Sequence, residues 1–473
     1  MSFAIDTQSP FLLYSRQTKG IFIKPEPDGG AGADGDGSAA PGGAGVRKGL
    51  TDMEIITSVK GFKDILPQET GKWQYVEEMA RKIFTDFGFR EIRIPILEKT
   101  ELFKRGIGEA TDIVEKEMYT FLDRGGEYLT LRPEATASVI RAYLEHSIYA
   151  ADPVVRLFTI GPMFRRERPQ KGRYRQFHQI NAELLGLDDP RIDAEIILML
   201  IHFLKSVGLA DLRLEINSLG CRQCRPAFKE SLIGLLQGKE DGLCGDCQRR
   251  LTTNPIRVFD CKMEQCGRII AQAPRLLDFI CSTCRDHFER VKGSLNAFEL
   301  SFEVNTRMVR GLDYYTKTAF EVTTEFLGAQ NAIAGGGRYD RLVKDLGGPD
   351  IAGVGFAIGF ERLISILPAK NEEFLVTPQL FIAALGSQAQ KTAFVLGNRL
   401  RMMGVRTEMD YTGKSLKGQM KRADRLKSRY TLILGDRELA EKRAELRDME
   451  KGTQETLSLN TLKEAIIKTL RER

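Results

Sequence analysis

The residues best suited to chemistry lie in one stretch, Phe164 to Glu183, which is rich in arginine and then alternates as a strand does. Guanidinium groups bind carboxylates and phosphates through paired hydrogen bonds, so this stretch could hold an anionic substrate. The alternation predicts that one strand face carries Arg175, Phe177, Gln179, Asn181 and Glu183. Polar groups on a covered sheet face must be paired or bind a ligand. The alternative is a solvated basic hairpin.

A second group of reactive residues is the cysteines, all eight of which fall between Cys221 and Cys284. They form four close pairs, which are Cys221/Cys224, Cys244/Cys247, Cys261/Cys266 and Cys281/Cys284. Two such pairs can hold one zinc ion tetrahedrally, so the spacing predicts two closed, structural zinc sites. Sequential pairing of the first with the second pair, and the third with the fourth, is the simpler arrangement, although the sequence does not fix it. Disulfide bonds and buried free thiols are the alternatives, and a cytoplasmic setting disfavours disulfides.

The arginine-rich stretch contains FRRERPQKGRYRQFHQ, which resembles motif 2 of the class II aminoacyl-tRNA synthetases, in the form found in histidyl-tRNA synthetases. Further segments resemble other motifs of that family in the same order, and the resemblance covers roughly residues 55–473. They are a helix and strand around Pro95 (motif 1), YLTLRPE at 128–134, MVRGLDYYTKTAFE at 308–321, AIAGGGRYD at 332–340 and GVGFAIGFERL at 353–363 (motif 3). The joint pattern is far more specific than any single segment.

The resemblance implies a reaction and its substrates. Histidine and ATP, the latter with Mg²⁺, would form histidyl-adenylate, and the 3′-terminal ribose hydroxyl of tRNA(His) would then take the aminoacyl group. The first step brings an amino-acid carboxylate against the α-phosphate, so fixed guanidinium groups should supply much of the catalysis. In the family, motif 1 forms the interface of a homodimer. Zinc follows from the cysteine spacing and is not implied by the resemblance.

Residue roles come from the same resemblance. The catalytic residues would be Arg165 and Arg310. Histidine would contact Glu134, Thr136, Gln179, Glu183, Arg310, Tyr314 and Tyr315. ATP would contact Arg165, Glu167, Arg175 and Arg362, and the acceptor end of tRNA would contact Arg168, Gln170 and Arg173.

Each assignment has an ordinary structural alternative. Glu134 could only cap a helix, and the cluster around Arg310 could be a tight turn. Two other functions also compete with catalysis, namely a catalytically silent synthetase paralogue that senses histidine and a zinc-dependent RNA-binding module. The presence of Arg165, Arg310 and Arg362 disfavours the silent paralogue, and the segment at 308–321 is unexplained by the RNA-binding module.

The elements that position these residues indicate a mixed α/β (α+β) fold with an antiparallel catalytic sheet. Hydrophobic spacing predicts a helix from Pro67 to Gly88, a strand over 90–98, and a strand-loop-strand unit built on 154–161 and the segment from Tyr174. The chain then divides into a disordered extension (1–52), a catalytic domain (53–216 and 298–374), a cysteine-rich insertion (217–297) and a small α/β domain (375–473) that resembles an anticodon-binding domain.

Composition is compatible with this reading. The chain has 473 residues, of which 42% are hydrophobic and 28% charged, and a net charge of +6 that permits a polyanionic partner. Because no apolar run approaches the roughly 20 residues that span a bilayer and no basic leader precedes the short FLLY run, we expect a cytoplasmic protein. The Gly-rich, Ala-rich segment before Met53 makes that methionine a candidate start.

Overall fold

The computed structural model describes residues 55–109, 111–170, 172–327 and 331–471. The two expectations for the N-terminal segment, disorder over residues 1–52 and a start at Met53, lie outside these ranges. Only the unit formed by Ser58–Arg473 is described below.

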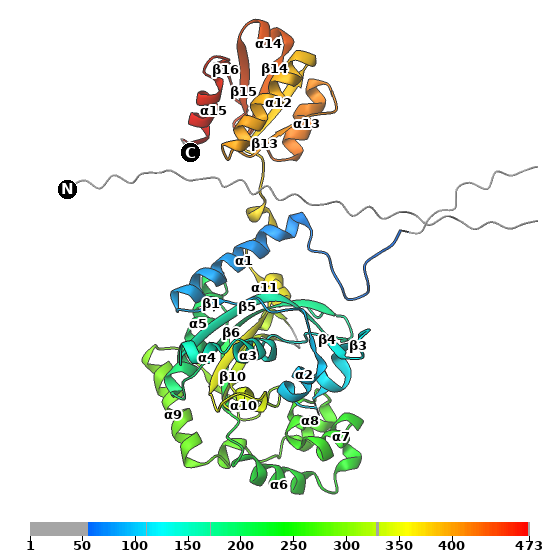
Figure 1. The fold of residues 1–473 in the computed structure, drawn as a ribbon, viewed down its shortest axis with the longest axis vertical. Helices are drawn as coiled ribbons and strands as arrows, with labels where there is room; N and C mark the ends of the chain where they lie inside the picture. The colour runs from blue at the N-terminus through cyan, green and yellow to red at the C-terminus, as the bar shows by residue number, and fades with distance from the viewer. Residues whose placement is uncertain (1–54, 110, 171, 328–330, 472–473) are drawn as a thin grey trace, which may run out of the picture. The chain divides into compact units, whose positions relative to one another are not determined.

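An eight-stranded sheet forms the centre of the catalytic part. Its strands lie side by side in the order β1 (Arg90–Glu91), β5 (Val155–Phe164), β6 (Gln176–Leu185), β11 (Gly353–Gly359), β10 (Ala332–Arg338), β9 (Thr316–Thr323), β7 (Arg213–Ser218) and β8 (Glu303–Val304). All neighbouring strands are antiparallel except the two edge pairs, β1 with β5 and β7 with β8. The prediction of an antiparallel catalytic sheet is therefore confirmed (Figure 1).

Two long helices cover the core of this sheet. The first, α1 (Pro67–Asp86), starts at a proline and is followed by Gly88, whose φ of 80° is the left-handed conformation that ends many helices. The second, α5 (Pro190–Ser206), begins with Asp189, whose side chain accepts a hydrogen bond from the backbone N–H of Arg191. Both helices bury apolar residues in the same core as β6, β9 and β11. The helix predicted from Pro67 to Gly88 is thus confirmed.

A small three-stranded sheet lies in the order β2 (Leu97–Lys99), β4 (Tyr128–Leu131) and β3 (Tyr119–Leu122). The helices near it in the sequence are α2 (Thr100–Ile107), the π-helix η1 (Ile113–Glu117), α3 (Thr136–Glu145) and α4 (Ile148–Ala151). The single strand predicted over residues 90–98 is wrong, because only β1 and β2 form and the residues between them leave the sheet. Pro95, which has no N–H to donate to a ladder, lies in that interruption.

The cysteine-rich segment between β7 and β8 is helical. It contains α6 (Arg225–Leu236), η2 (Glu240–Gly242), α7 (Gly245–Thr253), η3 (Pro255–Asp260), α8 (Glu264–Ile270), η4 (Leu276–Asp278) and α9 (Ser282–Ala297). Figure 1 shows α6, α7 and α8 gathered together, and α9 running back toward the sheet. Helix α9 packs on α5, so the segment is joined to the catalytic core through α9.

The remaining catalytic elements are short: η5 (Glu325–Leu327), α10 (Leu342–Asp345), α11 (Phe360–Ile366) and η6 (Asn371–Phe374). Helix α11 follows β11 directly, as predicted for motif 3. Its Phe360 and Leu363 are buried, so the helix packs on the core while its other face remains available to the cavity described below.

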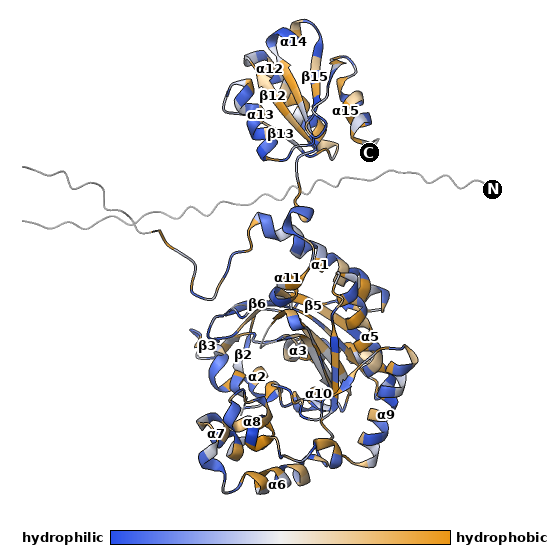
Figure 2. Ribbon diagram, turned by 180° about the vertical axis from the view of Figure 1, so that it is seen from behind, coloured by the Kyte–Doolittle hydropathy of each residue, from blue (hydrophilic) through white to orange (hydrophobic). Residues whose placement is uncertain are grey.

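The C-terminal part is a separate five-stranded sheet in the order β13 (Thr407–Met409), β12 (Leu380–Leu385), β14 (Tyr430–Gly435), β15 (Arg443–Asp448) and β16 (Gln454–Ser458). Its helices are α12 (Ser387–Met402), α13 (Leu416–Arg425), α14 (Asp436–Ala440) and α15 (Leu462–Arg471). Strand β12 is parallel to both β13 and β14, which confirms the predicted α/β pattern. Figure 2 shows hydrophobic residues along β12, which is buried, and along α5 of the catalytic part. Within the described ranges, no helix is long and apolar enough to cross a membrane.

Candidate active site and cysteine clusters

A cavity of about 230 Å³ opens over the antiparallel sheet, above β6, β9, β10 and β11. Strand β6 contributes Phe177 and Gln179, and β10 contributes the backbone around Gly335. The predicted alternation is confirmed, because Phe177 and Gln179 face the cavity whereas Ile180 is fully buried in the core on the other side. The floor of the cavity is thus the polar face of the sheet that the sequence indicated.

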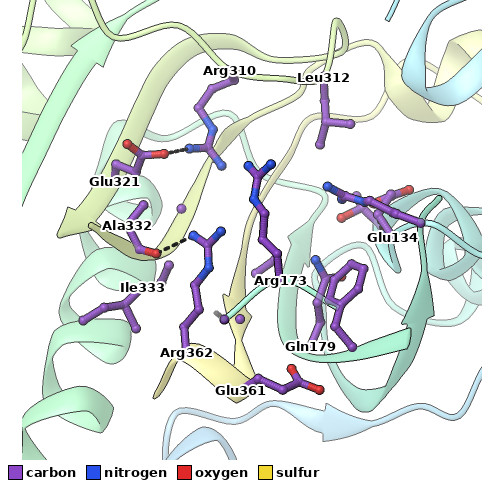
Figure 3. Close-up of a pocket in the computed structure, with 18 of the residues that line it drawn as sticks. Glu134, Arg173, Gln179, Arg310, Leu312, Glu321, Ala332, Ile333, Glu361 and Arg362 are labelled. Atoms are coloured by element: carbon purple, nitrogen blue, oxygen red, sulfur yellow. Dashed lines mark hydrogen bonds and ion pairs between the residues drawn. The ribbon is translucent and has the colours of Figure 1, made fainter. Parts of the chain in front are cut away.

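Guanidinium groups converge on one end of this cavity. Figure 3 shows Arg310, Arg173 and Arg362 extending toward one another from different elements. Arg362 donates from NH1 to the carbonyl oxygen of Ala332, at 2.8 Å. Arg173 lies 3.0 Å from a carboxylate oxygen of Glu167. Glu167 and Glu321 pair with guanidinium groups here, but the arginines outnumber these two carboxylates, so this end of the cavity is suited to a polyanion such as a triphosphate.

Arg165 lies on the β5 side of the same cavity, just after the strand ends. Its Nε donates to the carbonyl oxygen of Pro133 at 2.9 Å, and its guanidinium carbon lies 5.3 Å from the centre of the Phe177 ring. Its NH1 also lies 3.7 Å from a carboxylate oxygen of Glu167. These contacts fix the guanidinium in place before any ligand arrives, as electrostatic catalysis requires.

Arg310 is held on the opposite side by Glu321 of β9. Its NH1 donates to the carboxylate of Glu321 at 2.7 Å, whereas its Nε is buried and has no hydrogen-bond partner within the described ranges. The guanidinium lies 5.5 Å from the centre of the Tyr315 ring and against the backbone of Gly335. Leaving a buried donor without a partner costs free energy, so a ligand oxygen is the expected partner of this N–H group.

The other end of the cavity is acidic and buried. Both carboxylate oxygens of Glu134 accept backbone hydrogen bonds, from the N–H groups of Thr136 at 2.7 Å and Ala137 at 2.8 Å. Burial nevertheless raises the pKa of Glu134. The helix-capping interpretation of Glu134 is therefore correct for its geometry, and the same carboxyl group also lines the cavity. A capped carboxylate at this position suits an ammonium group.

Glu183 lies one layer behind Thr136 and does not line the cavity. It accepts hydrogen bonds from the hydroxyl groups of Thr136, at 2.7 Å, and Tyr339. Only 1% of Glu183 is exposed, and burial raises the pKa of its carboxyl group to about 8. The Glu183 carboxyl group is therefore mostly neutral at pH 7, and it can either donate or accept a proton there.

The residues predicted for tRNA and ATP are only partly brought together. Arg173, predicted at the tRNA acceptor end, lines the cavity, as do Glu167 and both tyrosines of the predicted histidine site, Tyr314 and Tyr315. Arg168 and Gln170 are exposed on the β5–β6 loop and stay outside it.

Arg175, predicted to bind ATP, does not line the cavity. Its guanidinium donates to the backbone carbonyls of Glu167 and Lys60, and its own N–H donates to the carbonyl of Gly61 at 2.8 Å. These contacts hold the base of the β5–β6 loop against the segment before α1. Alternation along a strand could not reveal this, because Arg175 lies just before β6 begins.

Several residues of the site were not predicted, and three of them bear directly on its geometry. Glu321 pairs with Arg310, Tyr339 bonds Glu183, and Leu312 lines the cavity from the loop that carries Arg310. Glu321 was detectable as an acidic residue on the strand that follows Arg310 in the segment at 308–321. Tyr339 lies two residues after the last of the three glycines, Gly337, but nothing local indicates a buried carboxyl partner.

The cysteines form two clusters, and the sequential pairing is wrong. Instead the outer pairs combine (Cys221, Cys224, Cys281, Cys284) and the inner pairs combine (Cys244, Cys247, Cys261, Cys266), with the sulfur atoms of each cluster within 4.8 Å of one another. The reason is topological: α9 returns along the entry of the segment, which brings its first turn beside Cys224. None of the eight forms a disulfide bond.

Each cluster has the dimensions of a four-thiolate zinc site. Sulfur atoms lie 3.5 Å apart for Cys221 and Cys224, and 3.7 Å apart for Cys244 and Cys261. Tetrahedral ligands at the usual Zn–S distance would be about 3.8 Å apart. Backbone N–H groups also point at the sulfurs, with Cys281 donating to Cys224 and Cys244 donating to Cys266, both at 3.2 Å. The eight sulfurs therefore fit two zinc ions.

Comparisons with known proteins agree with this geometry. A family model for histidyl-tRNA synthetase matches residues 61–363, and a model for an anticodon binding domain matches residues 379–469. The chain is 52% identical to a histidine–tRNA ligase of Syntrophotalea carbinolica over 416 residues, which are 88% of this chain and 99% of that protein. It is 54% identical to one of Geobacter metallireducens over 406 residues, 86% and 98% of the two chains.

Solved structures give the same result. The crystal structure of apo histidyl-tRNA synthetase from S. aureus is 37% identical and superposes with a TM-score of 0.73, covering 87% of this chain and all of that one. A histidyl-tRNA synthetase from Nostoc sp. PCC 7120 shares the fold at 21% identity, with a TM-score of 0.62 and coverage of 88% and 100%. With both its motifs and its fold matched over most of its length, the chain belongs to the histidyl-tRNA synthetase family.

Proposed function

We propose that the chain is a histidine–tRNA ligase, which activates L-histidine with ATP and transfers it to the 3′ end of tRNA(His). The observation that carries the proposal is the polarity of the cavity, with a capped carboxylate, Glu134, at one end and the guanidinium groups of Arg310, Arg173 and Arg362 at the other. Such a cavity matches a zwitterionic amino acid joined to a nucleotide. Kinship with named histidine–tRNA ligases at more than 50% identity supports it.

Histidine would occupy the acidic end. Its α-amino group would be held by Glu134, Thr136 and Gln179, which lie together on the cavity wall. Its imidazole would be bonded by Tyr314 and Tyr315, whose rings lie 4.6 Å apart, with Glu183 behind them. A site that hydrogen-bonds a polar ring strongly rejects amino acids that lack it. Glu183 would act indirectly, by giving a proton to, or taking one from, the hydrogen-bonded hydroxyl groups of Thr136 and Tyr339.

ATP would occupy the basic end. Arg165 and Arg310 would stand on either side of the reacting carboxylate and α-phosphate, where they neutralise the two anions and the charge that develops on the transferred phosphorus centre. Arg362 would contact the remaining phosphates, with Glu167 and Arg173 beside it. Magnesium, when bound with ATP, would supply further positive charge against the phosphates beside these arginines. Arg175 would act by bracing the loop rather than by touching ATP.

The tRNA would meet other surfaces of the chain. The exposed side chains of Arg168 and Gln170 stand on the β5–β6 loop and would reach the acceptor end together with Arg173. The C-terminal α/β part would bind the anticodon, with phosphate contacts from the basic helix α13. The domain boundaries given by the sequence, at residues 217, 298 and 375, are part of this proposal.

A homodimer in the cytoplasm completes the proposed assembly. Support for a dimer comes from the three-stranded sheet, where Leu97, Phe121, Leu122 and Tyr128 are between 39% and 64% exposed. Apolar side chains gathered on one small sheet are typical of a protein interface.

The cysteine clusters would hold one structural zinc ion each, because all four ligands of a cluster come from the chain and leave no open coordination position.

The test is histidine-dependent exchange of labelled pyrophosphate into ATP, without tRNA. Exchange should occur with histidine and with no other standard amino acid, and Arg310→Ala should reduce it by at least about a hundredfold, as expected for loss of a charged group in the transition state. Arg307→Ala is the matched control, because this arginine is exposed and its guanidinium group donates to the carbonyl of Ala271, away from the cavity. Histidine binding without exchange would instead assign the chain to the histidine-sensing paralogues.

A further inference from the structure

The loop that carries Arg310 has two sides, and only one of them faces the active-site cavity. Between β8 and β9 the chain is irregular, so its backbone groups are not paired within a strand. A second cavity of about 250 Å³ lies on its other side, and Arg310, Leu312 and Tyr315 line both cavities. The far wall of the second cavity comes from the cysteine-rich segment. This loop is therefore a thin partition between the active site and that segment.

Three side chains of the cysteine-rich segment reach the partition from behind. Asn254 donates from Nδ2 to a carboxylate oxygen of Asp313 at 3.0 Å. Arg257, which is 7% exposed, donates to the carbonyl oxygen of Arg310 at 3.5 Å. Arg225 donates to the carbonyl oxygen of Tyr315. The loop is thus bonded at both ends and in the middle, next to the residues that enter the active site.

The cysteine clusters fix the positions of these three side chains. Arg225 directly follows Cys224 of the outer cluster, at the first residue of α6. Asn254 and Arg257 lie between Cys247 and Cys261 of the inner cluster, in the short connection formed by α7 and η3. Each cluster therefore anchors a short piece of chain, and residues of that piece form hydrogen bonds with the Arg310 loop.

The inner cluster is also tied to the catalytic part through ion pairs. Arg250 of α7 lies 2.6 Å from a carboxylate oxygen of Asp112, and Lys116 lies 3.2 Å from one of Asp246. Asp112 immediately precedes η1, and the backbone carbonyl of Glu117 at the end of η1 accepts a hydrogen bond from the N–H of Arg166. The same helix, α7, is thus bonded on one side to the element that supports motif 2.

We propose that the cysteine-rich segment holds the Arg310 to Tyr315 loop in its ligand-binding conformation, so that Asn254, Arg257 and Arg225 are positioning residues for histidine activation. These residues act during the formation of histidyl-adenylate, which is the step that needs no tRNA. This role rests on the proposed function only in naming histidine as the ligand. The three residues line the second cavity and not the active-site cavity, so their role is exerted through the loop.

Asn254 gives the cleanest test, because its side chain makes one bond to the loop. Asn254→Ala should raise the histidine KM in pyrophosphate exchange about fivefold, while the ATP KM changes less than about twofold. Thr253→Ala is the matched control, because the Thr253 side chain is exposed and bonds only the carbonyl of Arg249 on its own helix. The control should leave both constants unchanged.

A charge exchange separates positioning from simple loss of folding. Asn254→Asp alone places two carboxyl groups against each other and should weaken histidine binding more than alanine does. Adding Asp313→Asn restores one donor and one acceptor at this contact. The rise in the logarithm of the histidine KM caused by Asn254→Asp should therefore fall by at least half in the double variant. A merely structural defect would lower the melting temperature of all variants and would not be rescued by the exchange.

Histidine binding by calorimetry keeps this test independent of catalysis. If the wild type binds histidine but shows no exchange, the proposed ligase function fails, while the affinities of the Asn254 variants still test the positioning role. Unchanged histidine affinity in Asn254→Ala and Asn254→Asp, in protein that melts normally, overturns the inference. Equal losses of histidine and ATP affinity would also overturn it, since a defect spread over the whole site is not positioning of this loop.

Discussion

Replacement of Glu183 by glutamine should stabilise the fold and weaken histidine binding together. The Glu183 carboxyl is buried between the hydroxyl groups of Thr136 and Tyr339, and burial raises its pKa from the ordinary 4.5 to about 8. A glutamine amide offers one acceptor and one donor, as the protonated acid does. It therefore keeps both contacts, with one of the two hydroxyl groups accepting a hydrogen bond from the amide instead of donating one, and it removes the need to take up a proton on folding.

The magnitude follows from proton linkage. A group whose pKa is raised by folding contributes full stability below its unfolded pKa, and that stability is lost as the pH rises toward the folded pKa. At pH 7 the unfolded carboxyl is ionised and the folded one is mostly protonated. The interval from 4.5 to 7 is about 2.5 pH units, and at 1.36 kcal/mol per unit this costs about 3 kcal/mol. At pH 5 the same cost is under about 1 kcal/mol.

The assay is thermal melting of Glu183→Gln and the wild type at pH 5 and pH 7, in the absence of ligands. The variant should melt about 4 °C higher than the wild type at pH 7 and within about 1 °C of it at pH 5. Its histidine affinity should fall by at least about tenfold, because the amide can no longer adjust its proton to the imidazole. Glu78→Gln is the matched control, because Glu78 is exposed on α1.

A pH-independent difference in melting temperature would refute the reasoning, since a stabilisation that does not follow the titration of the carboxyl group has another origin. A variant that melts below the wild type at pH 7 would refute it more directly. It would show that the ionised carboxylate is the form that the folded protein holds between Thr136 and Tyr339.

Two further outcomes are expected. Gly335→Ala should reduce the kcat of pyrophosphate exchange about ten- to a hundredfold while changing the melting temperature little, because the added Cβ would overlap the guanidinium group of Arg310 and displace it; Gly293→Ala, with open space on α9, is its control. Carefully reduced protein should contain about two zinc ions per chain by elemental analysis, and removing them with a chelator should lower the melting temperature; fewer than about 0.2 ions per chain would contradict the zinc assignment.

The sequence predicted the floor of the active site well because the floor is a regular strand. Alternation along β6 places Gln179 on the cavity face and Ile180 in the core, and both follow from a period of two. The arginines were recognisable because several of them stand in motifs with characteristic spacing. Local pattern was thus sufficient wherever the geometry is set by neighbouring residues.

Long-range pairing was not predictable in the same way. The cysteine clusters join Cys221 to Cys284 because α9 returns to the entry of the segment, and no spacing rule encodes that return. Tyr339 and Glu183 meet although 156 positions separate them. Arg175 turns away from the cavity because it bonds the carbonyls of Glu167 and Lys60. These features depend on which distant segments pack together, and a single sequence does not show that.

The nesting of the two clusters has a consequence for biosynthesis. The inner cluster is complete once Cys266 has left the ribosome, whereas the outer one must wait for Cys284, which lies beyond it in the chain. The chain between the first and last cysteines of the inner cluster is also shorter than that of the outer cluster, so closing it costs less conformational entropy. The segment can therefore mature from the inside outward, and its closure joins the two ends of the insertion before β9, the next strand of the central sheet after β8, has left the ribosome.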